Sequence, residues 1–430
     1  MFLTGRLLIV VLLGAVPILI WPNYAVPVLW ALFCVLLVCL DIAVAGSTKT
    51  ITMSRSSPGP LRLGQSTTCS IAVTNHGPTT FRGVLRDSWQ PSAGASGNTH
   101  PVAVPRAETR SVTTTLTPTR RGDRLAVRVV IRRVGPLGLA GRQRSVPLPG
   151  RVRALPPFDS RRLLPSRLAH LRQLDGRSAV RVRGQGTEFD SLRDYVEGDD
   201  VRSIDWRATA RRRSTVVRTW QPEKDRHIVI VLDTSRTSAG RVGDTPRLDA
   251  AMDAALLLAA LASHAGDRVD LIAGDRRVHR RVVGVGRTML LNSLVTAMAD
   301  LEPALLEADW PLLGAEVAKI GRQRALLVLL TPLEPAAVEE SLLPPLAVLA
   351  QRYKVIIGSV ADPALDAMLT ERADATEIYD AAAAARTLTL RNRTATAVGR
   401  LGVDVVDAAP DKLPARLADH YLLLKSRGLL

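Results

Sequence analysis

Cysteines are scarce in this chain and its histidines are dispersed, which removes two common kinds of site. Among 430 residues there are 3 cysteines, and Cys34 and Cys39 both lie in an apolar run near the N-terminus. A disulfide framework is therefore excluded from the remaining chain, and no cysteine spacing typical of a zinc site occurs. The 7 histidines include no pair at i and i+4, so a histidine-based zinc site is not expected.

Acidic residues are outnumbered by basic ones, and the formal net charge is +17. This balance suits an anionic partner, either nucleic acid, anionic lipid or an acidic protein surface, and does not choose among them. The composition, 47% hydrophobic and 23% charged, is that of a globular rather than a disordered chain. The length is sufficient for two or three domains with cores of their own.

Two apolar runs at the N-terminus predict a membrane anchor. Residues 7–21 and 26–40 are apolar throughout, and only the uncharged connector "PNYA" separates them. Each run with its flanks approaches the ~20 residues that cross the hydrocarbon core. Trp21, Tyr24 and Trp30 cluster near the connector, as aromatic residues do at a membrane interface. A signal peptide followed by one anchor, or a buried hairpin in a soluble core, are the alternatives.

Basic residues flank both outer ends of these runs and predict the orientation of the anchor. Arg6 precedes the first run, and Lys49, Arg55 and Arg62 follow the second. The positive-inside rule then places both termini and the soluble domains in the cytoplasm of a multi-pass protein of the plasma membrane. We therefore expect a two-helix transmembrane anchor over residues 1–48.

The rest of the chain reads as two folded parts joined by a basic segment. Residues 49–150 alternate apolar and polar positions between Gly, Pro and Asn turn signals, which predicts a small β-sandwich-like domain. Residues 151–225 are expected to form an Arg-rich linker, either solvated or in contact with anionic lipid, followed by an unusual charged stretch. Residues 226–430 alternate buried strands with helices, which predicts an α/β domain with a doubly wound sheet.

A possible metal site follows the first strand of the α/β domain. After the apolar run 227–232, Asp233, Ser235 and Thr237 stand at alternate positions, and such oxygen ligands suit Mg²⁺. This D-x-S-x-T pattern resembles the metal-ion-dependent adhesion site of von Willebrand factor A domains. That resemblance implies a second carboxylate at the end of a later strand, where this chain has Thr331 and Pro332. The pattern therefore leaves open a weak Mg²⁺ site or a loop that is mainly structural.

The charged stretch "YVEGDDVRSIDWRATARRR", residues 195–213, supports three interpretations. Its carboxylates could be catalytic, but no nucleophile or histidine accompanies them. Its arginines could bind nucleic acid, but aromatic residues are few and aspartates lie between the arginines. In the structural interpretation, which we favour, Asp199, Asp200 and Asp205 pair with nearby arginines and backbone N–H groups while Trp206 packs into the core.

The same stretch resembles the signature of the domain of unknown function 58 family. The matching residues are Gly198, Asp199, Asp200, Arg202, Ile204, Asp205, Trp206, Ala208 and Arg211, and Val201 stands where proline is common. The resemblance extends over the whole chain and implies a membrane-anchored protein with a von Willebrand factor A-like domain that acts with a MoxR-type AAA+ ATPase. No established activity comes with it.

We therefore expect a non-enzymatic adaptor that binds a protein partner, with no nucleic acid. The alternatives are a divalent-metal-dependent hydrolase or nuclease, which would use Asp233 and the Asp199–Asp205 loop, and a basic polynucleotide binder.

Overall fold

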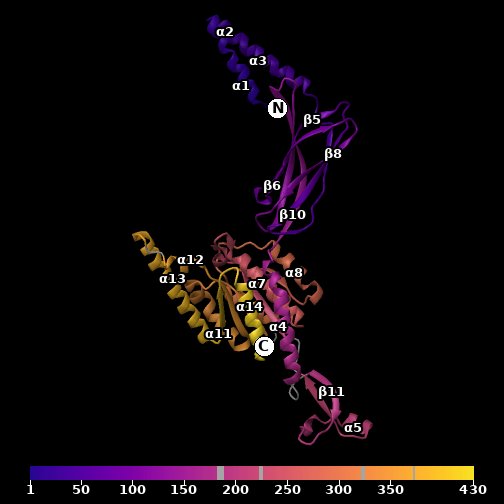
Figure 1. The fold of residues 1–430 in the computed structure, drawn as a ribbon, viewed down its shortest axis with the longest axis vertical. Coiled ribbons are helices and arrows are strands. Elements are labelled where there is room, and N and C mark those ends of the chain that lie inside the picture. Colours follow the sequence, from indigo (N-terminus) through magenta and orange to yellow (C-terminus); the bar gives the residue numbers. More distant parts are fainter. Residues whose placement is uncertain (182–187, 222–225, 321–324, 371–372) are drawn as a thin grey trace. The chain divides into compact units, whose positions relative to one another are not determined.

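The chain folds into two compact units, Met1–Leu155 and Pro156–Leu430 (Figure 1). The structure is a computed structural model that describes residues 1–181, 188–221, 226–320, 325–370 and 373–430. Residues 182–187 and 222–225, which belong to the predicted linker and signature region, lie outside the described residues. Both units contain sheets, and the fold as a whole is mixed α/β.

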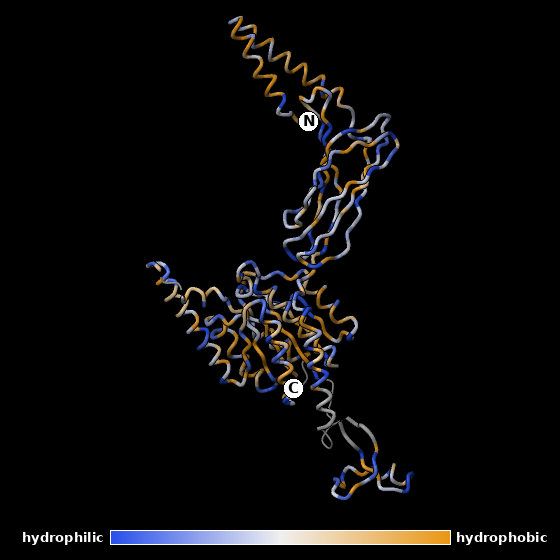
Figure 2. Tube along the Cα trace, viewed as in Figure 1, coloured by the Kyte–Doolittle hydropathy of each residue, from blue (hydrophilic) through white to orange (hydrophobic). Residues whose placement is uncertain are grey.

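The N-terminal apolar runs form a helical hairpin. The first run gives two short helices, α1 (Gly5–Leu13) and α2 (Ala15–Ile20), and the second gives α3 (Ala25–Val44). Among the described residues, α3 is the one helix long and apolar enough to cross a membrane, with a mean hydropathy of 2.5 over its most apolar window. Figure 2 shows the hydrophobic colour along both arms of the hairpin. Most large apolar side chains on these helices are exposed, so the folded chain alone does not cover them.

The rest of the first unit consists of two sheets that share a core. One sheet has the order β1-β10-β9-β5-β7, with β3 also paired to β10, and the other has the order β2-β4-β8-β6. Ile71 and Val73 of the second sheet pack with Phe81, Leu85 and Ile131 of the first. The strands are β1 (Phe2–Leu3), β2 (Ile51–Arg55), β3 (Leu61–Arg62), β4 (Thr67–Asn75), β5 (Phe81–Trp89), β6 (Ala95–Ser96), β7 (Thr99–Val104), β8 (Thr109–Leu116), β9 (Gly122–Val134) and β10 (Ala140–Leu155).

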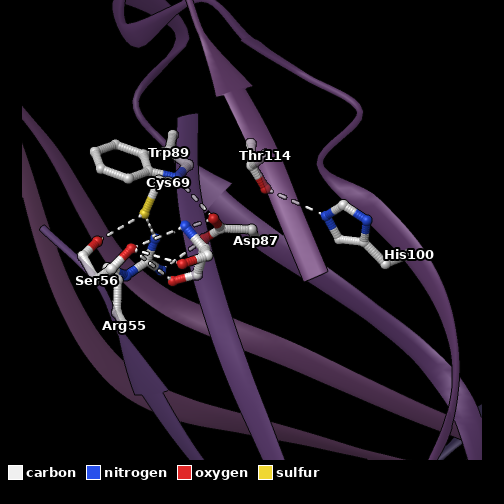
Figure 3. A network of polar contacts seen from close by, with 8 residues as sticks. Arg55, Ser56, Cys69, Asp87, Trp89, His100 and Thr114 are labelled. Carbon is white, nitrogen blue, oxygen red and sulfur yellow. Dashed lines mark hydrogen bonds and ion pairs between the residues drawn. The ribbon is translucent and has the colours of Figure 1, made fainter. Parts of the chain in front are cut away.

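A buried ion pair joins the two sheets (Figure 3). Arg55 at the end of β2 donates from Nη1 and Nη2 to the two carboxylate oxygens of Asp87 on β5, at 3.0 and 2.6 Å. The Trp89 indole N–H donates to Asp87 Oδ2 at 2.8 Å, and Cys69 Sγ lies 3.5 Å from Arg55 Nη1. The side chains of Arg55 and Asp87 are 2% and 0% exposed, so both charges depend on these partners.

The second unit is built on a six-stranded sheet with the order β17-β16-β13-β18-β19-β20. All neighbouring strands are parallel except the edge strand β17. The central strands are continuous apolar runs because helices cover both faces of the sheet. The strands are β13 (His227–Asp233), β16 (Arg268–Gly274), β17 (Val278–Val282), β18 (Leu326–Leu330), β19 (Lys354–Val360) and β20 (Asp404–Ala408).

The helices that pack on the sheet form two groups. One consists of α7, α8 and α14, with α7 in contact with the other two, and the second consists of α9, α11 and α13. Helix α7 is buried almost all round because α14 and α4 pack outside it. The helices are α4 (Leu164–Arg181), α6 (Arg236–Ala239), α7 (Arg247–His264), α8 (Arg287–Ala299), α9 (Trp310–Ile320), α10 (Pro335–Ala337), α11 (Leu343–Arg352), α12 (Ala364–Met368), α13 (Ala375–Arg400) and α14 (Leu413–Ser426).

The Arg-rich segment, which the sequence analysis interprets as a linker, is in large part a helix of this unit. Strand β10 runs on to Leu155, and α4 begins at Leu164 after a short 3-10 turn. Ser160 Oγ donates to Asp253 Oδ1 of α7 at 2.7 Å, and Arg167 Nε donates to Asp419 of α14 at 3.1 Å. Interpreting the described residues from 156 to 181 as a linker was therefore wrong, because α4 packs against α7 and α14.

The signature stretch forms a small hairpin of its own. Strands β11 (Glu188–Asp194) and β12 (Val216–Gln221) pair antiparallel, and between them lie the 3-10 turn η3 (Val201–Ser203) and helix α5 (Trp206–Arg212). Val216 and Val217 are buried, and Ile204 forms a bridge to Val217.

Candidate functional site

The three predicted metal-site residues meet at the carboxyl end of the central strand β13. Asp233 is the last residue of this strand, and the chain turns there into the short helix α6. The Asp233 carboxylate accepts hydrogen bonds from the Ser235 N–H at 2.7 Å and from Thr237 Oγ1 at 3.1 Å. Ser235 Oγ and Thr237 Oγ1 lie 3.0 Å apart. The i, i+2, i+4 spacing on one tight turn therefore does bring the three side chains together.

Thr331 completes this cluster from the neighbouring parallel strand. It follows β18, and its Oγ1 donates to Asp233 Oδ2 at 2.7 Å. The position at which the adhesion-site pattern would supply a second carboxylate thus supplies a hydroxyl that bonds to the first one. β13 and β18 lie where the strand order reverses, which is where doubly wound sheets bind ligands.

The electrostatics of the cluster disfavour a charged Asp233. Its side chain is buried, and this desolvation raises the pKa of Asp233 above its usual value, although hydrogen bonds from Thr331, Ser235 and Thr237 oppose the shift. The cavity beside it, which Trp310 and Ser341 help to line, has a volume of about 10 Å³. That is the space of about one water molecule.

These residues do not fit a self-sufficient divalent-cation site. The three hydroxyls are bonded to the Asp233 carboxylate or to each other. Glu307 also lines the cavity, but its carboxylate is paired with Arg236. No group of three or more His, Cys, Asp or Glu side chains suited to a metal occurs among the described residues. Mg²⁺ normally requires a more complete set of oxygen ligands than this.

A second polar cluster at the same edge of the sheet was not predicted. The Asp275 carboxylate, just after β16, accepts from Thr234 Oγ1 at 3.0 Å and lies 2.6 Å from His279 Nε2. Burial opposes ionisation of Asp275, but the hydrogen bonds from His279 and Thr234 outweigh it and hold the pKa of this carboxyl below its usual range. Asp275 and His279 lie on either side of the tight turn from β16 to β17. Their spacing of four residues was the one feature of the sequence that could have indicated this pair.

The aspartates of the signature stretch have partners within their own hairpin. Asp199 accepts from Arg193 Nη2 at 2.5 Å and from the Val196 N–H at 3.0 Å. Asp200 accepts from the Arg202 N–H at 2.9 Å. These bonds hold the loop that precedes η3.

Asp205 makes the most contacts of the three aspartates. It is the N-cap of α5 and accepts from the N–H groups of Arg207 and Ala208, both at 3.0 Å. Its other oxygen accepts from Arg218 Nε of β12 at 2.8 Å. The hydrogen bonds from the Ala208 N–H and from Arg218 lower the pKa of Asp205. Asp205 therefore ties the helix to the strand.

Trp206 corrects the interpretation of this stretch. Its side chain is 68% exposed, so the prediction that it packs into the core was wrong. Helix α5 has seven residues, begins at Trp206, and is held by the Asp205 cap and by contacts with β12. The backbone N–H of Arg202 donates to Asp200, whereas Arg211 is an exposed residue in the last turn of α5.

The burial of Asp233 leads to a pH-dependent prediction. Because folding raises its pKa, its contribution to stability is greatest below the ordinary aspartate pKa and is lost as the pH rises through the folded value. We expect Asp233→Asn to raise the free energy of unfolding of the second unit at pH 7 and to have little effect near pH 4. The urea midpoint of the full chain at both pH values measures this, with hydrogen exchange in α7 identifying the transition of the second unit.

Asp233→Ala is the matched comparison, because it removes the charge and also leaves the buried Ser235 N–H without its acceptor. It should destabilise the unit at both pH values. If Asp233→Asn instead lowers the free energy of unfolding equally at pH 7 and pH 4, the buried charge of Asp233 is not what destabilises the unit at pH 7.

Comparisons with known proteins give a family and no activity. Residues 191–398 match the family described as protein of unknown function DUF58. Uncharacterized protein Mb1516 of Mycobacterium bovis and uncharacterized protein Rv1480 of Mycobacterium tuberculosis are each 29% identical over 185 residues, or 42% of this chain. The match spans 57% of the length of each relative.

Similarities to solved structures are low and extend over parts of the chain. The Ro protein of Deinococcus radiodurans matches 49% of this chain and 36% of its own, at 16% identity and a TM-score of 0.24. A PapD-like domain of human CEP192 matches 24% of this chain and 84% of its own, at 13% identity and a TM-score of 0.17. Residues 191–398, which match the DUF58 family model, include most of the signature hairpin and the Asp233 cluster, so this part of the chain is similar to that family.

Proposed function

We propose that the protein is a membrane-anchored, non-enzymatic adaptor whose α/β unit binds a protein partner. The observation that carries this proposal is the exposed apolar hairpin of α1 to α3, which folds together with a β-structured unit. A bilayer is the environment in which such a surface is stable. In this proposal both arms of the hairpin cross the plasma membrane, and the termini and the two soluble parts are cytoplasmic.

The α/β unit would be a von Willebrand factor A-like domain. Its strand order, its antiparallel edge strand β17 and the D-x-S-x-T turn after the central strand support this assignment. Because the Asp233 cluster is bonded internally, we propose that it shapes the carboxyl edge of the sheet rather than holding a reactive metal.

The partner surface would lie at this carboxyl edge. The loop between α8 and α9 is bound to the site through its backbone: the Ala304 N–H donates to the Thr234 carbonyl, and the Arg236 N–H to that of Leu306, both at 2.8 Å. Leu305 is 81% exposed there, and Arg236 forms an exposed ion pair with Glu307 at 2.8 Å. An apolar residue surrounded by charged residues is typical of a protein-binding surface. The partner that the family resemblance suggests is a MoxR-type AAA+ ATPase.

The hydrolase alternative is less well supported. It requires Asp233 to act together with the Asp199–Asp205 loop, but the described hydrogen bonds of Asp199, Asp200 and Asp205 all stay within their own hairpin.

Co-purification tests the adaptor proposal. The full chain, reconstituted in lipid nanodiscs, should retain a MoxR-type ATPase encoded beside it. Leu305→Glu should weaken this binding by roughly tenfold or more, because it places a charge at the centre of the proposed contact. Met289→Glu is the matched control, since Met289 is also exposed but lies on α8 near the amino ends of the strands. Equal binding by both variants would rule out this surface, and no binding by the folded wild type would contradict the partner.

A further inference from the structure

The turn between β9 and β10 holds both ends of the apolar helical hairpin. We call residues 134–139 the tip. At the start of α1, the Thr4 N–H donates to the Leu139 carbonyl at 2.9 Å and Thr4 Oγ1 donates to that of Gly138 at 2.5 Å. Near the end of α3, the buried Asp41 carboxylate accepts from the backbone N–H groups of Leu137, Leu139 and Ala140 at 2.8 to 2.9 Å. The tip therefore lies where the chain enters and leaves the hairpin.

Several apolar side chains of the tip are exposed. Leu139 is buried, but Leu137 is 45% exposed, and Val134 and Pro136 are exposed as well. Leu3, in the short strand that pairs with the start of β10, adds another exposed apolar side chain beside them. Exposed apolar side chains at the base of an apolar hairpin indicate that the same medium covers both.

Arginines lie around the tip, and we call Arg6, Arg132, Arg133, Arg142 and Arg144 the basic collar. Arg142 Nε donates to the Ile42 carbonyl at 3.1 Å, and Arg144 Nη1 to that of Thr48 at 3.2 Å. Arg142 therefore reaches the last turn of α3, and Arg144 reaches the segment that follows it. The guanidinium of Arg6 lies beside Gly138 and that of Arg133 beside Gly46. Arg132 stacks over Phe2 with 5.3 Å between guanidinium and ring centre.

The negative charge on this side of the tip belongs to Asp41, which the three amides already bind. The collar therefore has an excess of positive charge next to an apolar surface. Arginine side chains suit a phosphate group because their N–H donors match its oxygens. An apolar surface surrounded by arginines is stable at the boundary between lipid headgroups and acyl chains, because the apolar side chains enter the acyl region and the arginines bind the headgroups.

We propose that the tip is a membrane-interface element: Val134, Pro136 and Leu137 enter the boundary between headgroups and acyl chains, and the basic collar binds the phosphates of anionic lipids. This proposal rests on the membrane anchoring proposed above. It adds that the β-structured unit contacts the bilayer at a defined point and is not held by the helices alone.

Fluorescence quenching in vesicles tests the proposal. A fluorophore sensitive to polarity is attached to Leu137→Cys in the full chain, reconstituted in vesicles of phosphatidylcholine and phosphatidylglycerol. Cys34→Ala and Cys39→Ala remove the helix thiols, and Cys69 is kept because it is buried. Nitroxide-labelled lipid should quench the Leu137 probe several-fold more than aqueous iodide does. Val127→Cys is the control, since Val127 is 59% exposed on β9, ten residues before Leu137 and outside the tip.

Flotation of the same vesicles separates this proposal from the anchor itself. A chain that does not float would overturn both. A chain that floats while its Leu137 probe responds to iodide as the Val127 probe does would overturn the tip and leave the anchor standing. Arg132→Gln together with Arg142→Gln should reduce lipid quenching at Leu137 in anionic vesicles more than in neutral ones. An equal effect in both would overturn the assignment of the collar to anionic headgroups.

Discussion

Replacing Asp87 by alanine should destabilise the β-structured unit by roughly 3–5 kcal/mol, the cost of leaving one member of a buried ion pair without its partner. Arg55 would keep its charge inside the core, because its side chain is 2% exposed. In the wild type, burial disfavours the Arg55 cation, but its bonds with Asp87 and Cys69 outweigh this and raise its pKa. Without Asp87 that support is lost, and a guanidinium still does not deprotonate near neutral pH, so the charge stays buried. The Trp89 indole N–H would also lose its acceptor.

Hydrogen exchange of the full chain measures this effect. Protection of the β4 and β5 amides should fall by about two to four orders of magnitude, since each tenfold change corresponds to about 1.4 kcal/mol. Glu108→Ala is the control, because its ion pair with Arg110 is exposed and should contribute at most about 1 kcal/mol. The double variant Arg55→Met, Asp87→Leu should recover much of the lost protection, as apolar replacements of buried pairs often do. If the double variant is as unstable as Asp87→Ala, the unpaired charge is not the cause.

Replacing Asp41 by alanine should detach the end of α3 from the tip. Three backbone N–H groups lose their acceptor, and those of Leu139 and Ala140 are buried. At about 1–3 kcal/mol for each buried donor left unsatisfied, the loss is on the order of 3 kcal/mol. Because water cannot reach these amides without opening the turn, the local structure rather than the whole unit should respond.

The readout is amide exchange of residues 135–141 in nanodiscs, which should accelerate by about a hundredfold while β4 changes little. Asp41→Asn should give an intermediate value, because its side-chain oxygen can still accept part of these bonds. Ser47→Ala is the local control, since it removes an exposed bond to the Lys49 N–H. Unchanged exchange at the tip in Asp41→Ala would show that the helices hold this turn by other contacts.

Local patterns in the sequence predicted much of the fold. The buried strand 227–233 and the polar residues that follow it were recognisable because they are consecutive, and the turn brings Asp233, Ser235 and Thr237 together. Contacts between residues far apart in the chain could not be predicted from such local patterns. Asp41 meets amides more than 90 residues away, and Arg55 and Asp87 are 32 residues apart.

Two predictions were wrong: that the segment containing α4 is a linker, and that Trp206 is buried. Leu164, Leu168 and Leu171 recur at helical spacing, but the surrounding arginines obscured the apolar stripe with which α4 packs on α7. Trp206 was predicted to be buried because large aromatic side chains usually are. Its helix is short, capped by Asp205 and contains no buried residue, and the indole of Trp206 is exposed.

Few residues connect the last strand of the first unit to the first turn of the second. Strand β10 ends at Leu155 and the 3-10 turn of the second unit begins at Asp159, so three residues, including Pro156 and Pro157, connect them. A fully extended chain would span roughly 14 Å between these points. A flexible linker of the predicted length would instead let the second unit move through a large volume around the first. If the α/β unit binds a partner as proposed, the short connection would keep that partner at a high effective concentration near the first unit.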